Sequence, residues 1–379
     1  MRFIYADNAA TTRLSDTALE AMLPYLREEY GNASTLYKLG RSAHNAIASA
    51  RRTFADGIQA IPAEIFFTSG GTESDNWAIK GTAHRLAAQG KRHIVTDNIE
   101  HHAVLNSTKA LEKEGFDVTY IMADKNGVVR AEDVKAAIRP DTALVSVMFA
   151  NNELGTIQPV AEIGHVCREA GVLFHCDAVQ AAGILPIDVK AMDIDLLSMS
   201  AHKFHGAKGV GVLYARRGCA PEVYIDGGEQ EYHHRAGTEN VAGIVGAAAA
   251  FAEALGEREH KAARLAQMRD EIQAGLLKIP AAVVNGANAA RLPGTLNMSF
   301  SGVDGQSLIF ALDSNGIAAS SGSACASGSI SPSHVLLALG LPYSLAHGSL
   351  RISLGRYNTS GEVNTVIQTV TRVITEMRA

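Results

Sequence analysis

The sequence of 379 residues is 47% hydrophobic, with 34 Lys and Arg against 39 Asp and Glu residues and a formal net charge of −5. A chain of this length and composition forms a large core and is long enough for more than one domain. Because it has no basic block, it lacks the electrostatic footprint of a protein that binds nucleic acid or an anionic membrane, and we expect neither as a partner.

The first predicted element is a helix. The stretch before it, MRFIYADNAATTRL, has no signal-like apolar region, and no later apolar run reaches about 18 residues, so we expect a cytoplasmic protein. Ser15 is the predicted N-cap of the helix, and Pro24 is a candidate kink. Its apolar stripe consists of Ala18, Leu19, Met22, Leu23 and Leu26.

Between about residue 60 and residue 215, short β-branched runs alternate with helical patterns, which is typical of βα units and a mostly parallel sheet. Several runs are apolar throughout, as expected for strands covered on both faces. Helices are predicted over Thr72 to Gln89 and Val160 to Ala170. The predicted strands are EIFFT, RHIVT, DVTYIMA, TALVSVMF, GVLFHC, DLLSMS and GVGVLYA.

The C-terminal third predicts a smaller α+β domain. The alanine-rich part of the proline-free gap between Pro221 and Pro280 indicates a long connecting helix. TLNMSF and SLRISLGR are predicted strands, and Thr359 and Glu362 form a capping box before the last helix. We therefore divide the chain into an N-terminal segment (1–15) that packs with the small domain, a large domain (16–255) and a small domain (256–379).

Polar residues that follow apolar runs are candidates for a site, because ligands of open α/β sheets bind beyond the carboxyl ends of the strands. The glycine turn at Gly71 and Thr72 opens a helix, whose first N–H groups favour a phosphate, although such turns are also routine. His101 is a candidate ring contact or proton carrier, or a surface residue. Asn152 is a candidate ligand donor or a turn former.

Two further strand ends carry a carboxylate and an amine. Asp177 follows GVLFHC, where it either pairs with a protonated ring nitrogen or caps the next helix. Lys203 lies in SMSAHKFHG, either as a solvated loop charge or as a reactive amine. A phosphate cradle, a carboxylate and a lysine at neighbouring strand ends match the requirements of pyridoxal phosphate, which needs a Schiff-base lysine and a partner for its ring nitrogen.

Ten motifs in order resemble the cysteine desulfurases of the NifS/IscS class, within the class V aminotransferase family of fold-type I pyridoxal phosphate enzymes. The resemblance implies an α/β fold with a large domain, built on a mostly parallel seven-stranded sheet flanked by helices, and a smaller α+β C-terminal domain. The motifs are DNAATT, GNAS, FTSGGTESDN, EHHAV, ANNELGT, DAVQAAG, SAHKFHGAKGVG, RAGTEN, SSGSACASG and LRISLGRYNT.

The resemblance also assigns roles in cofactor binding. Lys203 is the expected Schiff-base lysine, Asp177 pairs with the pyridinium, and His101 stacks on the ring. Contacts to the phosphate or the phenolic oxygen are expected from Gly71, Thr72, Gln180, Ser200 and His202. Thr238 is expected to reach the phosphate of the neighbouring subunit, which implies a homodimer.

For the substrate, L-cysteine, the resemblance places Asn152 beside the ring and the carboxylate on Arg351. A planar guanidinium suits that bidentate contact, although a buried structural arginine is the other interpretation. Arg356 is the second candidate for the carboxylate.

Cys325 lies among small residues in SSGSACASGSIS, a segment without apolar periodicity that predicts a mobile, exposed loop. The resemblance implies that Lys203 removes the Cα proton of the substrate and that the Cys325 thiolate then takes the sulfur as a persulfide, with release of L-alanine. An iron–sulfur scaffold protein is the expected acceptor. The persulfide on Cys325 is also a candidate ligand of a transient [2Fe-2S] cluster.

Other functions stay open at this point. A selenocysteine lyase and a class V aminotransferase are alternative enzymes, and a non-catalytic iron–sulfur scaffold is an alternative from another class. A nicotinamide dehydrogenase is excluded, because GAKGVGV lacks the G-x-G-x-x-G fingerprint and leads into a strand.

Overall fold

The computed structural model describes residues 3–321 and 332–379. Within these ranges, a central sheet has the strand order β2-β8-β7-β6-β5-β3-β4, in which β8 is antiparallel to both neighbours and the other six strands share one direction. The strands are β2 (Ile65–Thr68), β3 (His93–Asp97), β4 (Asp117–Ile121), β5 (Thr142–Ser146), β6 (Leu173–Asp177), β7 (Leu196–Ser200) and β8 (Gly211–Ala215). All seven predicted strands are confirmed.

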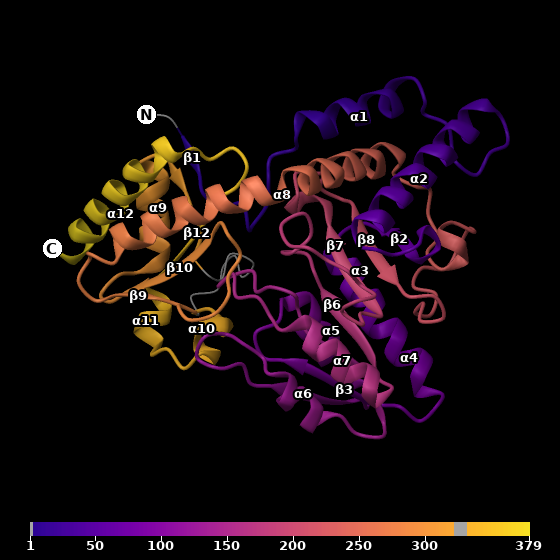
Figure 1. Ribbon diagram of the computed structural model, residues 1–379, viewed down its shortest axis with the longest axis horizontal. Helices are drawn as coiled ribbons and strands as arrows, with labels where there is room; N and C mark the ends of the chain where they lie inside the picture. Colours follow the sequence, from indigo (N-terminus) through magenta and orange to yellow (C-terminus); the bar gives the residue numbers. More distant parts are fainter. Residues whose placement is uncertain (1–2, 322–331) are drawn as a thin grey trace.

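Except for the edge strand β4, the strands of this sheet are almost entirely buried on both faces, which explains why they are mostly apolar. Successive side chains belong to opposite faces: Phe66 and Leu196 pack in one hydrophobic cluster, and Phe67 and Leu197 in another. The helices of this part are α1 (Asp16–Arg27), α2 (Lys38–Gly57), α3 (Gly71–Asn76), α4 (Thr82–Ala87), α5 (His102–Lys113), α6 (Ala131–Ala137) and α7 (Val160–Ala170). Figure 1 shows them around the strands.

The predicted helices are confirmed with small shifts at their ends. Ser15 caps α1 by accepting a hydrogen bond from the Ala18 N–H at 3.1 Å, and Pro24 lies inside that helix. The helix expected over Thr72 to Gln89 is α3 and α4, joined without a break by a π-helical turn at Trp77–Gly81. The turn was not predicted.

A long helix, α8 (Val241–Leu276), connects this part to the C-terminal part, as the proline-free stretch predicts. Its first half, including Ala247 and Phe251, belongs to the large core on the sheet, and its second half, including Leu265 and Ile272, belongs to a separate core. At 1.5 Å per residue the helix is about 54 Å long. In Figure 1 it spans from one part of the molecule to the other.

The second core is built on a three-stranded antiparallel sheet of β9 (Ala282–Val284), β10 (Thr295–Phe300) and β12 (Ser349–Ser353). β1 (Ile4–Tyr5) pairs with β11 (Ile317–Ala318), which brings the N-terminal segment to this part of the chain. The Thr359 N–H donates to Glu362 Oε2 at 3.2 Å, as the predicted capping box requires. The helices here are α9 (Gly305–Ser314), α10 (His334–Ala338), α11 (Tyr343–His347) and α12 (Val363–Arg378).

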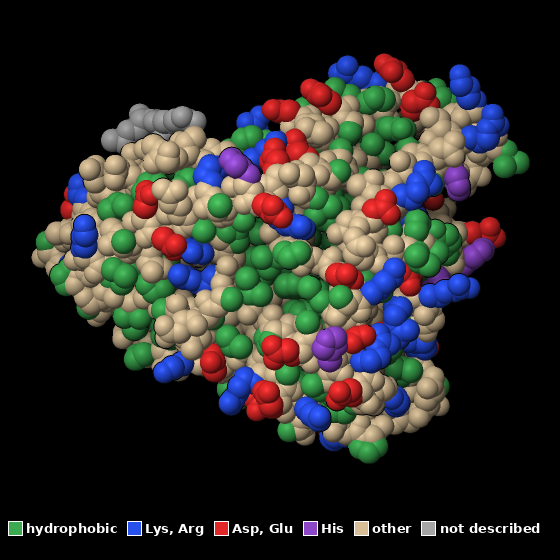
Figure 2. Space-filling view, viewed as in Figure 1, with side chains coloured by type: hydrophobic (Ala, Val, Ile, Leu, Met, Phe, Trp, Pro, Cys, Tyr) green, Lys and Arg blue, Asp and Glu red, His purple; other side chains and the backbone are tan. Residues whose placement is uncertain are grey.

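The two cores do not divide strictly along the sequence. Val335 and Leu336 of α10 belong to the large core, although they lie within the small domain predicted over 256–379. The domain boundaries therefore stay a prediction. None of the described helices is both long and apolar enough to cross a membrane. Figure 2 shows acidic and basic side chains interspersed over one face of the molecule.

Candidate functional site

Asp177 and Lys203 follow two adjacent parallel strands at the same edge of the sheet. Asp177 is the last residue of β6, opposite Ser198 of β7, and Lys203 ends the short 3₁₀ turn Ala201–Lys203 that follows β7. The carboxylate and the amine sense each other's charge, because Lys203 lowers the pKa of Asp177. The structure thus brings together the two groups that the sequence places at neighbouring strand ends.

The Asp177 carboxyl is buried, and burial raises its pKa from the ordinary value of 3.8 to about 6. Its Oδ1 atom accepts a hydrogen bond from the Val179 N–H at 2.8 Å, which opposes this rise. At neutral pH the group is therefore mostly ionised and able to neutralise a cation.

Lys203 is held by the N-terminal loop, residues 6–15 between β1 and α1. Its Nζ donates to the carbonyl oxygens of Ala9 at 2.6 Å and Ala10 at 2.9 Å. Gln180 Nε2 donates to the same Ala9 oxygen at 3.0 Å, so that two predicted cofactor residues share one acceptor. This contact joins positions about 190 residues apart in the sequence.

His101 is the N-cap of α5. Its Nδ1 atom accepts a hydrogen bond from the Ala103 N–H at 3.1 Å, so the neutral ring carries its proton on Nε2. Burial and the nearby charge of Lys203 lower the pKa of His101 to about 4. His101 is therefore a neutral ring at physiological pH, close enough to the Lys203 amine for that charge to lower its pKa.

The glycine turn after β2 lies against the end of β7. A Cβ atom at Gly71 would come within 2.7 Å of Val179 Cγ2 and 3.5 Å of Ser200 Cβ, so this position has no room for a side chain unless Val179 moves. Gly71 and Thr72 are the first residues of α3, where helical N–H groups have no partner within the helix. The turn is thus a narrow cradle with free donors, next to Ser200.

His202 precedes Lys203 in the same turn, and its Nδ1 atom lies 3.0 Å from Thr11 Oγ1. Burial and the charge of Lys203 lower its pKa to about 4. Its neutral ring therefore offers hydrogen bonds without adding charge.

Arg351 is buried at the centre of β12. Its Nη2 atom donates to Asp7 Oδ1 at 2.7 Å and its Nη1 atom to the Asn152 carbonyl oxygen at 2.8 Å. The Nε atom is buried and has no hydrogen-bond partner among the described residues. A buried guanidinium with an unused donor is a suitable partner for a substrate carboxylate.

Three other predicted residues are not among the side chains described above: Arg356, Thr238 and Cys325. Arg356 forms ion pairs with Glu253 and Glu257, which already neutralise it. Thr238 is exposed, a position compatible with contact to another subunit. Cys325 lies outside the described residues.

The three described cysteines are buried free thiols. Burial raises the pKa of Cys167 to about 12 and that of Cys176 well above its ordinary value, and it also raises the pKa of Cys219. Because the thiolate is the nucleophile, none of the three is suited to attack sulfur at neutral pH.

The sequence analysis missed a group of three buried carboxyls near Asp177: Asp75, Asp97 and Glu100. Burial raises the pKa of Asp75 and Glu100 well above their ordinary values and that of Asp97 to about 7, and the charge of Asp177 adds to the rise at Asp75 and Glu100. These carboxyls titrate as a coupled group, in which an ionised Asp177 disfavours ionisation of Asp75 and Glu100. Asp97 is the last residue of β3 and Glu100 follows three residues later, so their position at a strand end was the available signal.

These residues fit the pyridoxal phosphate that the resemblance implies. A side chain at Gly71 would close the cradle, and the mostly ionised Asp177 suits a protonated ring nitrogen. The charge of Lys203 lowers the pKa of both His101 and Asp177, so the amine is near both groups. Among the described residues, no group of three His, Cys, Asp or Glu side chains is arranged to hold a metal ion.

Comparison with known proteins extends over nearly the whole chain. Residues 4–366 match the family described as aminotransferase class-V. The chain is 50% identical over 375 residues to the cysteine desulfurase IscS of Methanosarcina thermophila, a match that covers 99% of this chain and 93% of that protein. Among solved structures, it is similar to a NifS-like protein with 39% identity and a TM-score of 0.92, covering 99% of this chain and 100% of that chain. It is also similar to SspA in complex with cysteine, with 38% identity and a TM-score of 0.83 over 94% of this chain and 100% of that chain.

Proposed function

The chain belongs to the aminotransferase class-V family, among its cysteine desulfurases, and from this premise we propose that it converts L-cysteine to L-alanine and transfers the sulfur to Cys325. Pyridoxal phosphate is the family's cofactor. The family and the fold inferred from the ten motifs are thereby confirmed.

One observation carries the proposal. Asp177 ends β6, and Lys203 ends the turn that follows the neighbouring strand β7. The charge of Lys203 lowers the pKa of both Asp177 and His101. When bound, the cofactor supplies an electron sink for the charge that develops at the substrate Cα. A carboxylate that stays ionised would pair with the protonated ring nitrogen and support this chemistry, whereas a dehydrogenase or a structural scaffold has no need of it.

We assign the remaining roles to the residues of the chain as follows. Lys203 holds the cofactor covalently and moves the Cα proton once it is free. Arg351 binds the substrate carboxylate, which uses its buried Nε donor, and Asn152 lies beside it through the carbonyl contact to Nη1. His101, neutral with its proton on Nε2, is positioned to exchange a proton with the substrate thiol.

The cofactor phosphate is assigned to the turn with Gly71 and Thr72, supported by the adjacent Ser200. His202 and Gln180 are assigned to the phosphate or the phenolic oxygen. Exposed Thr238 completes the phosphate site of a neighbouring subunit, which makes the protein a homodimer.

The sulfur carried by Cys325 passes to an acceptor protein, for which an iron–sulfur scaffold is our proposal. The high pKa values of the three buried thiols support Cys325 as the nucleophile by contrast. A transient [2Fe-2S] cluster with Cys325 as a ligand, and a cytoplasmic location, are further proposals from the sequence.

The test is a visible absorption spectrum of the purified protein with and without L-cysteine, together with assays of alanine and sulfide. The wild type is expected to be yellow and to release both products in the presence of a reductant. Lys203→Ala is expected to lose covalent attachment of the cofactor. Cys325→Ala is expected to stay yellow but to release neither product, and Cys219→Ala serves as the matched control with normal turnover.

Full turnover by Cys325→Ala would instead favour an aminotransferase. A wild-type protein that stays colourless after addition of pyridoxal phosphate would overturn the cofactor assignment. Turnover of selenocysteine but not of cysteine would identify the protein as a selenocysteine lyase.

A further inference from the structure

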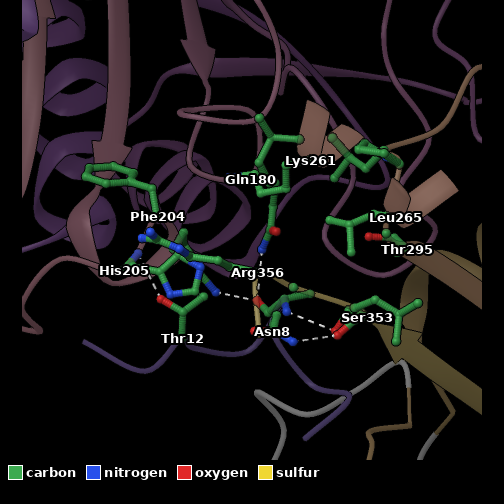
Figure 3. Close-up of a pocket in the computed structure, with 18 residues that line it drawn as sticks. Asn8, Thr12, Gln180, Phe204, His205, Lys261, Leu265, Thr295, Ser353 and Arg356 are labelled. Atoms are coloured by element: carbon green, nitrogen blue, oxygen red, sulfur yellow. Dashed lines mark hydrogen bonds between the residues drawn. The ribbon is translucent and has the colours of Figure 1, made fainter. Parts of the chain in front are cut away.

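A pocket lies between the two cores, next to Lys203. The empty space at the pocket, counted together with open solvent at its mouth, is about 590 Å³. Figure 3 shows side chains from the N-terminal loop, the segment after β7, and the end of β12 around it. Among the described residues that we assign to the cofactor and the substrate, only Lys203 and Gln180 line it. The pocket is therefore a separate space that adjoins the site.

The pocket has a cationic side and an apolar side. Lys261 of α8 and Arg356 contribute the charges, and Leu265, Leu292 and Pro293 form an apolar wall. No Asp or Glu side chain is part of the lining among the residues that the structure describes. This combination suits a ligand that has one anionic group and a small apolar body.

Lys261 supplies the specific evidence for an anion. Its half-buried ammonium group has no hydrogen bond or ion pair with any residue of 3–321 or 332–379. Burial lowers the pKa of Lys261; Glu257 opposes this effect, and the positive charge of Arg356 adds to it. Arg356 is paired with Glu253 and Glu257, whereas no carboxylate of the described residues lies within ion-pair distance of the Lys261 ammonium.

The N-terminal loop connects the pocket to Lys203. Asn8, Ala9 and Thr12 line the pocket, and the Ala9 carbonyl accepts hydrogen bonds from both Lys203 and Gln180. Before Lys203 attaches the cofactor, its Nζ must leave the carbonyls of Ala9 and Ala10 and lose a proton. A negative charge in the adjoining pocket favours the protonated amine and therefore opposes that step.

We propose that the pocket lined by Lys261, Arg356 and Leu265 binds a small organic carboxylate, and that its occupancy slows the attachment of the cofactor to Lys203. The carboxylate contacts the Lys261 ammonium, and the apolar body packs on Leu265, Leu292 and Pro293. An inorganic anion would leave that apolar wall uncovered. The binding does not depend on the proposed function, whereas its effect on Lys203 rests on that function.

Binding is tested by calorimetric titration of the full chain, loaded with pyridoxal phosphate, with benzoate as the probe and uncharged benzamide as its isosteric control. Benzoate is expected to bind, and both Lys261→Met and the change to benzamide are expected to weaken binding at least about tenfold, or about 1.4 kcal/mol. Lys278→Met, which removes an exposed lysine beyond the end of α8, is expected to bind benzoate normally. Thermal melts verify that each variant is folded.

Arg351→Gln distinguishes the pocket from the substrate site. Benzoate binding that is lost in Arg351→Gln but kept in Lys261→Met would place the probe at the substrate site and overturn the proposal. Equal affinity for benzoate and benzamide, or absence of binding, would also overturn it.

The coupling is tested by the rate at which the apoprotein gains visible absorbance after addition of pyridoxal phosphate. Saturating benzoate is expected to slow this rate at least about twofold in the wild type and in Lys278→Met, but not in Lys261→Met. An unchanged rate in the wild type would refute the coupling. If the protein loads no cofactor yet binds benzoate through Lys261, the proposed function fails while the pocket assignment stands.

Discussion

Replacement of Asp177 by asparagine is expected to have two effects of opposite sign. Burial raises the pKa of Asp177 from 3.8 to about 6, so the folded apoprotein holds this proton more tightly than the unfolded chain. The corresponding stabilisation is fully present below pH 3.8 and is lost as the pH rises through about 6. The loss amounts to about 3 kcal/mol, and Asp177→Asn avoids it because the amide carries no charge. The variant apoprotein should therefore be more stable than the wild type above pH 6.

The same change should weaken the binding of pyridoxal phosphate. We propose an ionised Asp177 as the partner of the protonated ring nitrogen. Loss of one member of such a buried charge pair costs about 2 to 5 kcal/mol, which corresponds to about 30-fold to several thousandfold in affinity. In the wild type, affinity should also fall about tenfold for each pH unit below about 6, as Asp177 becomes protonated. Asp177→Asn should lack this component of the pH dependence.

Two measurements at several pH values between 5 and 8 test the reasoning: the urea midpoint of the apoprotein and the dissociation constant of the cofactor. The cofactor phosphate titrates in the same range, so the informative quantity is the difference between wild type and Asp177→Asn at each pH. A variant apoprotein that is less stable at pH 8 but binds the cofactor as tightly as the wild type would refute the reasoning.

Three further predictions concern single side chains. Arg351→Lys should raise KM for L-cysteine at least about tenfold while Arg356→Lys leaves it within about twofold, as measured by initial rates of alanine release. His101→Gln should lower kcat about 100-fold with little change in KM in the same assay, because it removes a proton carrier. Arg51→Met should lower the free energy of unfolding by about 3 to 5 kcal/mol in urea titrations, since it leaves the buried Glu231, now 2.7 Å from Arg51 Nη1, without its counter-charge. A smaller loss in the Arg51→Met, Glu231→Gln double variant would support this cause.

The central sheet could be predicted from the sequence because its signals are local. Strands buried on both faces are short apolar runs, and the polar residues that follow them mark the edge where the site lies. These signals predict that Asp177 and Lys203 lie at neighbouring strand ends. The helix of residues 71–87 was also predictable, but its π turn at Trp77–Gly81 has no proline or other local signal.

The contacts that join distant segments could not be predicted in this way. The Ala9 and Ala10 carbonyls that hold Lys203, and the Asp7 carboxylate that holds Arg351, lie in the motif DNAATT, which has no hydrophobic periodicity to show what it contacts. Backbone carbonyls leave no mark in the sequence at all. The buried carboxyls around Glu100 were missed for a related reason, since Asp75 and Asp177 come from segments distant in the sequence and approach Asp97 and Glu100 only in the folded protein.

The N-terminal loop contacts both the proposed substrate residue Arg351 and the proposed cofactor residues Lys203 and His202, so we expect changes at one set to alter the other. Asp7 pairs with Arg351 at 2.7 Å, two residues before the Ala9 carbonyl that accepts from Lys203, and Thr11 contacts His202. A carboxylate that binds Arg351 competes with Asp7 for the same guanidinium, so it loosens one end of the loop whose other contacts hold Lys203. We therefore expect substrate binding and release of the lysine to be linked through the backbone of residues 7–10, the segment on which a ligand in the proposed pocket would also act.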